Sequence, residues 1–201
     1  MKYYRKLIGK KCYLSPVSEE DADQYCQWLN DWEVTQNTLV FRQQLSLSKE
    51  EDILKEMITS GAAAFAIVDI QTDKLIGNCS LFNIEKLNRK AELGIIIGDK
   101  SYWNRGYGTE ATQLLLDYGF NILNLHNIML EVFSFNKRAI ASYQKVGFKF
   151  IGKRREALIM GGKKYDEIMM DILSTEFTSP FLKVNFNKLN PKNNKKDKNE
   201  N

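Results

Sequence analysis

Only three cysteines and one histidine occur among the 201 residues of this chain. The cysteines, Cys12, Cys26 and Cys79, are odd in number and widely spaced, and no two of them have CxxC spacing. This pattern predicts neither a disulfide framework nor a zinc site, and we expect no metal ion. The single histidine, His126, has no evident partner in the sequence around it, and we interpret it as structural.

A long apolar run is also missing. The N-terminal stretch MKYYRKLIGKK contains no apolar segment of the length that a signal peptide needs, and no window of the chain resembles a membrane span. We therefore expect a cytoplasmic protein that does not have a membrane as its partner.

Most of the chain lacks an excess of either charge. The formal net charge is +4, and residues 183–201 alone supply six lysines against Asp197 and Glu200. The remainder is near neutral, which argues against an extended nucleic-acid surface. From residue 178 onward the sequence is rich in lysine and asparagine and poor in apolar residues. We expect residues 1–177 to form a single domain and residues 178–201 to form a flexible tail, with a nucleic-acid-binding arm as the alternative for the tail.

Segments with the apolar pattern of strands and segments with the pattern of helices follow one another along the chain. A hydrophobic content of 43% over this length can bury one substantial core. Apolar periodicity predicts strands at 11–17, 63–70, 74–84, 90–98, 127–135, 148–160 and 165–173, and helices after Ser18, from Ser48 to Gly61, from Gly106 to about Ile122 and from Asn136 to Gly147. Residues 30–38 show no clear pattern and are expected to be irregular. Helices that come early and alternate with strands later predict a mixed α/β protein of the α+β type.

The stretch YWNRGYGTEATQ, residues 102–113, places two glycines in front of an expected helix. Glycines at a helix start allow a phosphate to approach backbone N–H groups. The turn is not a Walker A loop, because no GxxxxGK[ST] string occurs. It does match the dinucleotide pattern, with Ala111 in the third glycine position. However, the nearest candidate for the ribose-binding acid, Glu131, lies about 25 residues after Gly106, and hairpins flank the turn, which does not suit a doubly wound parallel sheet.

Two motifs together resemble the GNAT superfamily of N-acetyltransferases. WNRGYG, residues 103–108, corresponds to the family's phosphate loop [Q/R]xxGx[G/A], and NKRAIASYQKVGF, residues 136–148, matches Nxx[AS]xxxYxKxGF at every specified position. Trp103 stands at the Gln/Arg position, as is common in the branch that acetylates ribosomal protein termini, polyamines and aminoglycosides. The resemblance covers residues 11–173.

The resemblance implies a central mixed, mostly antiparallel sheet with helices on both faces, and acetyl-CoA as co-substrate. By the same resemblance, main-chain groups near Ile96 and Ile97 bind the pantetheine arm, and an amide N–H near Ile97 polarises the thioester. The glycine-rich turn and the second motif would supply the remaining coenzyme contacts. These residues are Trp103, Asn104, Arg105, Gly106, Tyr107, Gly108, Thr109, Asn136, Ala139 and Tyr143.

Three side chains are candidates for the proton transfers of acetyl transfer. The resemblance places Tyr143 beside the coenzyme sulfur as the acid, and its alternative is a core aromatic of an amphipathic helix. Glu131 lies among apolar residues of a strand, where a carboxylate should have a raised pKa, and it resembles the general base of some family members. Its alternative is an ion-paired or edge-facing carboxylate, while Glu92 is the competing base or a substrate-orienting group. Asn136 would contact the pantetheine arm, cap its helix, or both.

The acceptor site should come from the N-terminal region, by analogy with the family. Trp32 and Glu33, together with Trp28 and the loop through Phe41, combine aromatic walls with a carboxylate, which suits a cationic amine. Packing of these residues against the sheet is the alternative. We expect acetyl transfer to a primary amine: a polyamine, an amino sugar such as an aminoglycoside, or a protein N-terminus. Homodimers are common among similar proteins, and a non-catalytic acyl-CoA-binding sensor is the alternative function.

Overall fold

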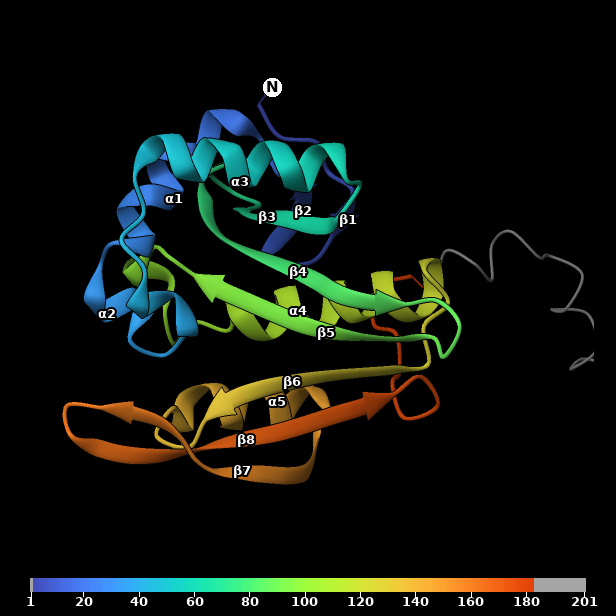
Figure 1. Ribbon diagram of the computed structural model, residues 1–201. Coiled ribbons are helices and arrows are strands. Elements are labelled where there is room, and N and C mark those ends of the chain that lie inside the picture. Colours follow the sequence, from blue (N-terminus) through green and yellow to red (C-terminus); the bar gives the residue numbers. More distant parts are fainter. Residues whose placement is uncertain (1, 183–201) are drawn as a thin grey trace, which may run out of the picture.

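The computed structural model describes residues 2–182, and in them eight strands form one sheet. The strands lie in the order β1-β2-β3-β4-β5-β6-β8-β7 (Figure 1). Every neighbouring pair is antiparallel except β5 and β6, which are parallel. The strands are β1 (Leu7–Ile8), β2 (Cys12–Pro16), β3 (Ala63–Asp69), β4 (Leu75–Glu85), β5 (Lys90–Ile97), β6 (Asn127–Phe133), β7 (Lys149–Met160) and β8 (Lys163–Leu173). The predicted mixed, mostly antiparallel sheet is confirmed.

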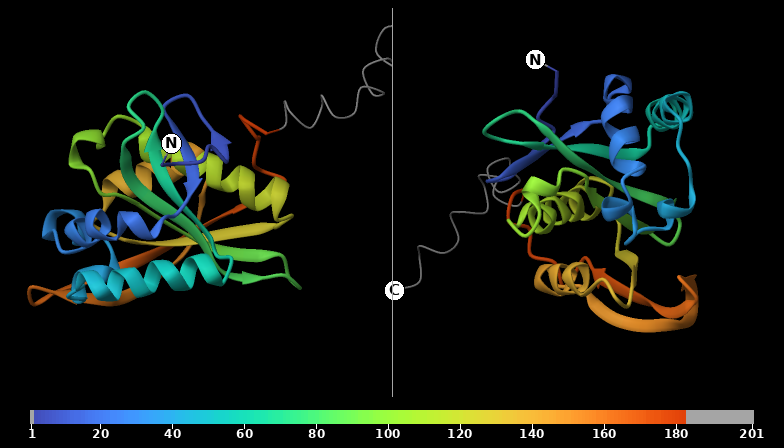
Figure 2. Two further views of the ribbon diagram at one scale, coloured as in Figure 1. Left: turned by 90° about the horizontal axis from the view of Figure 1, so that it is seen from above. Right: turned by 90° about the vertical axis from the view of Figure 1, so that its left-hand side faces the viewer.

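Helices cover both faces of the sheet (Figure 2). α1 (Ala22–Leu29) and α3 (Leu47–Thr59) pack on one face, and α4 (Tyr107–Asp117) and α5 (Lys137–Val146) pack on the other. The shorter elements are α2 (Trp32–Thr35), three 3-10 turns at Glu19–Asp21, Leu39–Arg42 and Lys100–Tyr102, and a π-helical turn at Tyr118–Ile122 that continues α4. None of the helices in residues 2–182 has the length and apolar content needed to cross a membrane.

Each face has its own core because the side chains of β3 alternate between them. All seven residues of this strand are buried. Phe65 and Ile67 belong to the larger cluster, which includes the apolar face of α4, whereas Ala66 and Val68 belong to a smaller cluster with Tyr25 of α1. The uninterrupted apolar run AAFAIV therefore reflects a strand that is covered on both sides.

Two local predictions in the N-terminal half are wrong. Helix α3 begins at Leu47, because Ser46 rather than Ser48 caps it by accepting a hydrogen bond from the backbone N–H of Lys49. Leu45, directly before the cap, is buried and fixes the direction from which the chain enters the helix. Residues 30–38 are not wholly irregular, since they contain the single-turn helix α2, whose cap is Asp31.

The chain stays packed beyond the expected domain boundary at residue 178. Phe181 and Leu182 contact the larger cluster, and Ser179 is buried. The backbone N–H of Leu182 donates a hydrogen bond to the Ser179 hydroxyl. The packed region therefore extends at least to Leu182, and the rest of the expected tail, residues 183–201, lies outside the described residues.

Candidate active site

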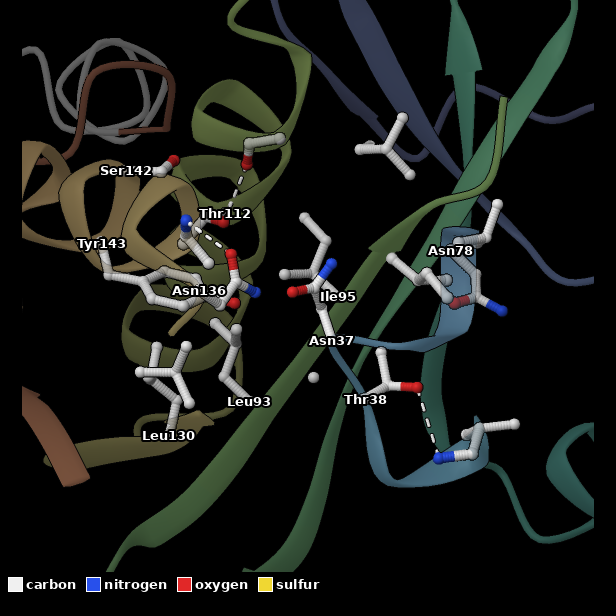
Figure 3. A pocket seen from close by; sticks show the side chains of 18 of the residues that line it. Asn37, Thr38, Asn78, Leu93, Ile95, Thr112, Leu130, Asn136, Ser142 and Tyr143 are labelled. Carbon is white, nitrogen blue, oxygen red and sulfur yellow. Dashed lines mark hydrogen bonds between the residues drawn. The ribbon is translucent and has the colours of Figure 1, made fainter. Parts of the chain in front are cut away.

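A cleft begins where the two parallel strands separate. β5 and β6 pair at three positions, the last of which joins Glu92 to Met129. Beyond it, Leu93 of β5 and Leu130 of β6 line a cleft of about 800 Å³. The N-terminal ends of α4 and α5 form further walls of this cleft (Figure 3). The divergence of the strands thus opens the sheet at its centre and exposes main-chain groups that a continuous sheet would pair.

The edge of β5 that borders the cleft carries backbone groups able to bind a ligand. A Cβ added at Gly77 of β4 would collide with the oxygen of Ile96, so the Ile96 carbonyl points toward β4. Because successive peptide groups of a strand point to opposite edges, those of Ile95 and Ile97 point toward the cleft. There the Ile97 oxygen accepts a hydrogen bond of 2.7 Å from Trp103 Nε1. The expectation that Ile96 offers its main chain to pantetheine is therefore corrected in favour of its two neighbours.

The turn before α4 presents backbone donors to the cleft. Gly106 is the N-cap, with a φ of +85° that favours glycine, and no side chain caps the helix. Glu110 donates the first hydrogen bond of the helix, to the oxygen of Gly106, so the three preceding N–H groups have no intrahelical acceptor. A Cβ added at Gly108 would meet only Ile97, at 3.7 Å, which shows that the surrounding residues leave room here. The arrangement fits an anionic pyrophosphate.

Two side chains of this turn point away from the cleft. The ring of Tyr107 is buried, and its hydroxyl donates a 2.7 Å hydrogen bond to Asp69 at the end of β3. Burial and this hydrogen bond raise the pKa of Tyr107 to about 12, which fits a structural role for the side chain in the turn. Arg105 donates to the oxygen of Ser101 and lies over the ring of Tyr102. Arg105, which was expected among the coenzyme contacts, does not line the cleft.

The first turns of α5 form the opposite wall. Asn136 caps the helix by accepting a 3.1 Å hydrogen bond from the backbone N–H of Ala139, which confirms its capping role. Tyr143 extends from the same helix toward β5 (Figure 3). Burial raises the pKa of Tyr143 to about 12, so the phenol is neutral at physiological pH. A 2.8 Å hydrogen bond between the hydroxyls of Thr109 and Ser142 fixes α5 against α4.

Three carboxylates line the cleft from the other face of the strands. Strand register places Glu92, Glu131 and Glu167 on one face, and all three border the cleft. Burial raises the pKa of Glu131, and the charges of Glu167 and Glu92 raise it further, while Arg154 opposes them. The direction agrees with the expectation from the sequence, although neighbouring acids contribute to it as well as the apolar strand. Glu92 accepts a 2.9 Å hydrogen bond from Asn83.

Several charged residues of the cleft were not among the candidates from the sequence, and Glu167 and Arg138 are two of them. Glu167 lies far from both motifs in the sequence, and the pairing of β8 with β6 brings it to the cleft. Arg138 occupies a variable position of the second motif, and its guanidinium lies 4.4 Å from the ring centroid of Trp103 on the opposite wall. The sequence could have indicated Arg138 as a cleft residue, because it is a cation two residues after the predicted helix cap Asn136.

Trp32 and Glu33, which were expected to line the amine pocket, do not line the cleft, whereas Asn37, Thr38 and Val40 of the loop through Phe41 do. Helix α2 turns Val34 inward and leaves Trp32 on the outside, where it is 54% exposed and packs edge-on against Phe41. Glu33 is exposed and pairs with Lys100 at 2.7 Å. The prediction for Trp32 and Glu33 is therefore corrected, and the physical reason is the single helical turn that the sequence did not reveal.

Two further residues have packing or surface positions. Trp28 is buried in the smaller core cluster, where its ring covers Gly98 so closely that any side chain there would collide with it. His126 lies outside the cleft, with Nδ1 3.0 Å from the hydroxyl of Ser174.

Residues 11–149 match the Acetyltransferase (GNAT) domain family. The chain belongs to the GNAT family. This match contains both motifs, the glycine-rich turn and the segment from Asn136 to Phe148, so the family assignment rests on the same residues that build the cleft.

The relatives of this GNAT chain are N-acetyltransferases. An uncharacterized N-acetyltransferase, p20, of Bacillus licheniformis is 31% identical over 174 residues, which cover 85% of this chain and 97% of the relative. The spermidine N(1)-acetyltransferase of Vibrio cholerae is 31% identical over 132 residues, or 66% of this chain and 76% of that enzyme. A crystal structure of spermidine N-acetyltransferase from Vibrio cholerae in complex with CoA and spermine has a TM-score of 0.76 at 28% identity, and covers 84% of this chain and 98% of that one. The chain is an N-acetyltransferase of the GNAT fold.

Proposed function

We propose that this GNAT enzyme transfers the acetyl group of acetyl-CoA to a primary amine by direct attack of the amine on the thioester. One observation carries the proposal. A neutral, half-buried tyrosine and a group of three carboxylates reach the same cleft from opposite faces of the separated strands, beside a helix start with open backbone donors.

The coenzyme would lie along the cleft between β5 and α5. The N–H groups of Tyr107, Gly108 and Thr109 would hold its pyrophosphate, helped by the positive end of the α4 dipole. The backbone of Ile95 and Ile97 would pair with the pantetheine amides, and the N–H of Ile97 would polarise the thioester carbonyl. Trp103, Asn104, Asn136 and Ala139 also line this part of the cleft, and Arg138 would add a cation there.

The reaction forms one C–N bond and breaks one C–S bond. The lone pair of the neutral amine attacks the carbonyl carbon, and the electron pair of the C–S bond leaves with the sulfur. The amine nitrogen loses a proton to a carboxylate of the cleft, directly or through water, and the thiolate gains a proton from Tyr143. The main contribution of the protein is to hold the two reactants in this geometry.

Tyr143 acts late in this reaction. Its pKa of about 12 lies above that of a free thiol, which is about 8.5, so complete early transfer of its proton would be uphill. A neutral phenol is nevertheless a good hydrogen-bond donor, and the charge that develops on sulfur in the enclosed cleft strengthens that bond. Tyr143 would therefore stabilise the departing thiolate first and protonate it as the C–S bond breaks.

Glu131 is the proposed base. Its raised pKa brings the carboxylate closer to the range in which it can take a proton from an ammonium ion. Burial and the like charges of Glu167 and Glu92 are the reasons that Glu131 accepts a proton readily, because the neutral form suits the buried position and relieves the repulsion. The same two carboxylates would attract the cationic acceptor before it reacts.

A cationic acceptor suits this cleft best. The Vibrio cholerae relatives are named for spermidine acetylation, and the acidic face described above favours an acceptor of that kind. A polyamine is therefore the preferred acceptor, and an amino sugar or a protein N-terminus would present the same reactive group.

The test combines coenzyme binding with turnover. Acetyl-CoA is incubated with the full chain and with polyamines, aminoglycosides and peptides that have free N-termini, and released thiol is measured. We expect micromolar coenzyme binding by calorimetry and amine-dependent thiol release, with polyamines giving the highest kcat/KM. Absence of coenzyme binding, or thiol release that no amine accelerates, would overturn the proposal.

A further inference from the structure

The cleft extends beyond the coenzyme walls and under the N-terminal helices. This extension, the α3 lobe, is lined by Leu29, Val34, Leu45, Ile53, Met57 and Glu50. Five of these side chains are apolar and one is a carboxylic acid. The proposed coenzyme site does not need the α3 lobe, because the glycine-rich turn, the edge of β5 and α5 form the walls of that site.

Glu50 is the exceptional residue of the α3 lobe. Only 3% of Glu50 is exposed to solvent, yet the residue borders the cleft. Within residues 2–182, its carboxylate accepts no hydrogen bond and forms no ion pair. Burial alone raises its pKa. Buried carboxylates are usually paired or hydrogen-bonded, so an unpartnered one that lines a cavity points to a ligand that completes it.

The position of Glu50 in the fold offsets part of the free energy that burial of its carboxylate costs. Glu50 lies in the first turn of α3, where the positive end of the helix dipole favours an anion. Its backbone N–H donates to the oxygen of Ser46, which fixes the residue within the helix while the side chain stays without a partner. The position is therefore suited to a carboxylate that is ionised when a cation arrives.

A purely structural role would involve Tyr25. Within the described part of the chain the Tyr25 hydroxyl is buried without a partner, and the charge of Glu50 is one of the smaller causes that raise its pKa, after burial and Asp21. A rotation that joined Glu50 to Tyr25 would satisfy both groups inside the protein. That account predicts an effect of Glu50 on stability and none on the choice between acceptors.

We propose that Glu50 binds a second cationic nitrogen of the acceptor, one that is not acetylated, while the apolar side chains of the α3 lobe contact the hydrocarbon spacer between the two nitrogens. This inference rests on the proposed function, and it assigns the acceptor to the class of aliphatic diamines and polyamines. In this arrangement carboxylates would lie near both ends of the bound acceptor. Glu131 and its neighbours would lie near the reacting amine, and Glu50 would lie near the second nitrogen in the α3 lobe. An acceptor with a single positive charge would leave Glu50 unpaired. If its uncharged hydrocarbon end entered the α3 lobe, that end would lie against a buried carboxylate, which disfavours binding.

The deciding experiment measures binding and turnover with paired acceptors. Putrescine and spermidine are each compared with a linear alkylamine of matched length, which has the same reactive amine and no second charge. Calorimetry on the CoA-saturated full chain gives Kd, and thiol release gives kcat/KM. We expect the wild type to prefer each polyamine over its matched alkylamine by about 10-fold or more in both measurements.

Glu50→Gln removes the charge and keeps the shape and hydrogen-bonding capacity of the side chain. We expect it to reduce the preference for the polyamines to about 1, chiefly through KM and Kd rather than kcat. Glu56→Gln, the same substitution at an exposed position of the same helix, should retain the wild-type preference. Tyr25→Phe should alter stability only. The Gln variant should unfold at the wild-type temperature or above it, because it loses an unpartnered buried charge.

The outcomes separate the two proposals. A wild type that binds polyamines and alkylamines equally, or a Glu50→Gln variant that keeps the preference, overturns the role of Glu50 even when acetylation proceeds. A binding preference that depends on Glu50, without any acetyl transfer, supports the α3 lobe as a cation subsite and overturns the proposed reaction instead.

Discussion

The indole Nε1 of Trp103 donates a 2.7 Å hydrogen bond to the backbone oxygen of Ile97, at the cleft edge of β5. The same indole is covered on its other side by the guanidinium of Arg138 from α5, 4.4 Å from the ring centroid. Trp103 therefore connects the glycine-rich turn to both walls of the cleft. At the position where the family motif has Gln or Arg, the tryptophan supplies an N–H donor and an aromatic surface instead of an amide or a guanidinium.

Trp103→Phe should weaken coenzyme binding without unfolding the protein. The ring remains beneath Arg138, but the Ile97 oxygen loses its donor and the turn loses its attachment to β5. A lost hydrogen bond of this kind costs about 1 kcal/mol, so we expect a rise of about 5- to 10-fold in the Kd of CoA by calorimetry. Trp32→Phe is the matched control, because Trp32 lies outside the cleft. The Kd of CoA for this variant should equal that of the wild type. Equal Kd values for both variants would show that the bond does not position the turn.

Tyr143→Phe separates catalysis from packing. The ring packs edge-on against Phe148, at 5.8 Å between centroids, and the variant keeps that contact. Loss of the hydroxyl should lower kcat by about 100-fold or more, since a positioned general acid contributes roughly that factor, with little change in the Kd of CoA. Single-turnover thiol release measures the chemical step directly. An unchanged kcat would leave Tyr143 with its alternative role as a core aromatic.

The pH dependence of kcat/KM should report the carboxylates that surround Glu131. Burial and the charges of Glu167 and Glu92 raise its pKa, and Arg154 lowers it. A base must be deprotonated to act, so activity should rise with pH through the pKa of Glu131. Glu167→Gln removes a like charge, lowers that pKa and shifts the acidic limb to lower pH, whereas Arg154→Met removes the opposing cation and shifts it to higher pH.

Opposite shifts in the two variants are the critical result for Glu131. The pKa of the acceptor amine in solution also affects the profile, but neither substitution changes it. Acidic limbs that coincide in the wild type and both variants would assign the observed ionisation to the amine and would argue against Glu131 as the base.

Periodicity in the sequence was sufficient for the elements that build the cleft, because each of them buries one clear face. The apolar segments KAELGIIIG and NIMLEVFSF predicted β5 and β6, and the stripe through Ala111, Leu114 and Leu115 predicted α4. The two motifs then located the glycine-rich turn and the wall that carries Tyr143. These features depend on residues that are close together in the sequence.

Features that depend on distant pairing could not be predicted in the same way. Glu167 reaches the cleft through the register of β8 on β6, and Glu50 reaches it through the docking of α3, neither of which a local pattern encodes. Trp32 and Glu33 were assigned to the pocket on residue type and on analogy with the family. The single turn of α2, which directs Val34 inward instead, is too short to produce a recognisable period.

Glu110 provides a test of how α4 is attached to the sheet. Its Oε1 atom accepts hydrogen bonds from the backbone N–H groups of Lys11, at 2.6 Å, and Cys12, at 3.1 Å, so one buried carboxylate satisfies two donors at the start of β2. Glu110→Ala leaves both donors without a partner and should lower the free energy of unfolding by about 3 kcal/mol. Glu110→Gln retains an acceptor oxygen and should cost less than half of that, while Glu56→Ala on the exposed face of α3 should cost under about 0.5 kcal/mol. Urea denaturation gives all three values, and equal losses for Glu110→Ala and Glu110→Gln would mean that the charge of Glu110, rather than its acceptor oxygen, holds the helix start in place.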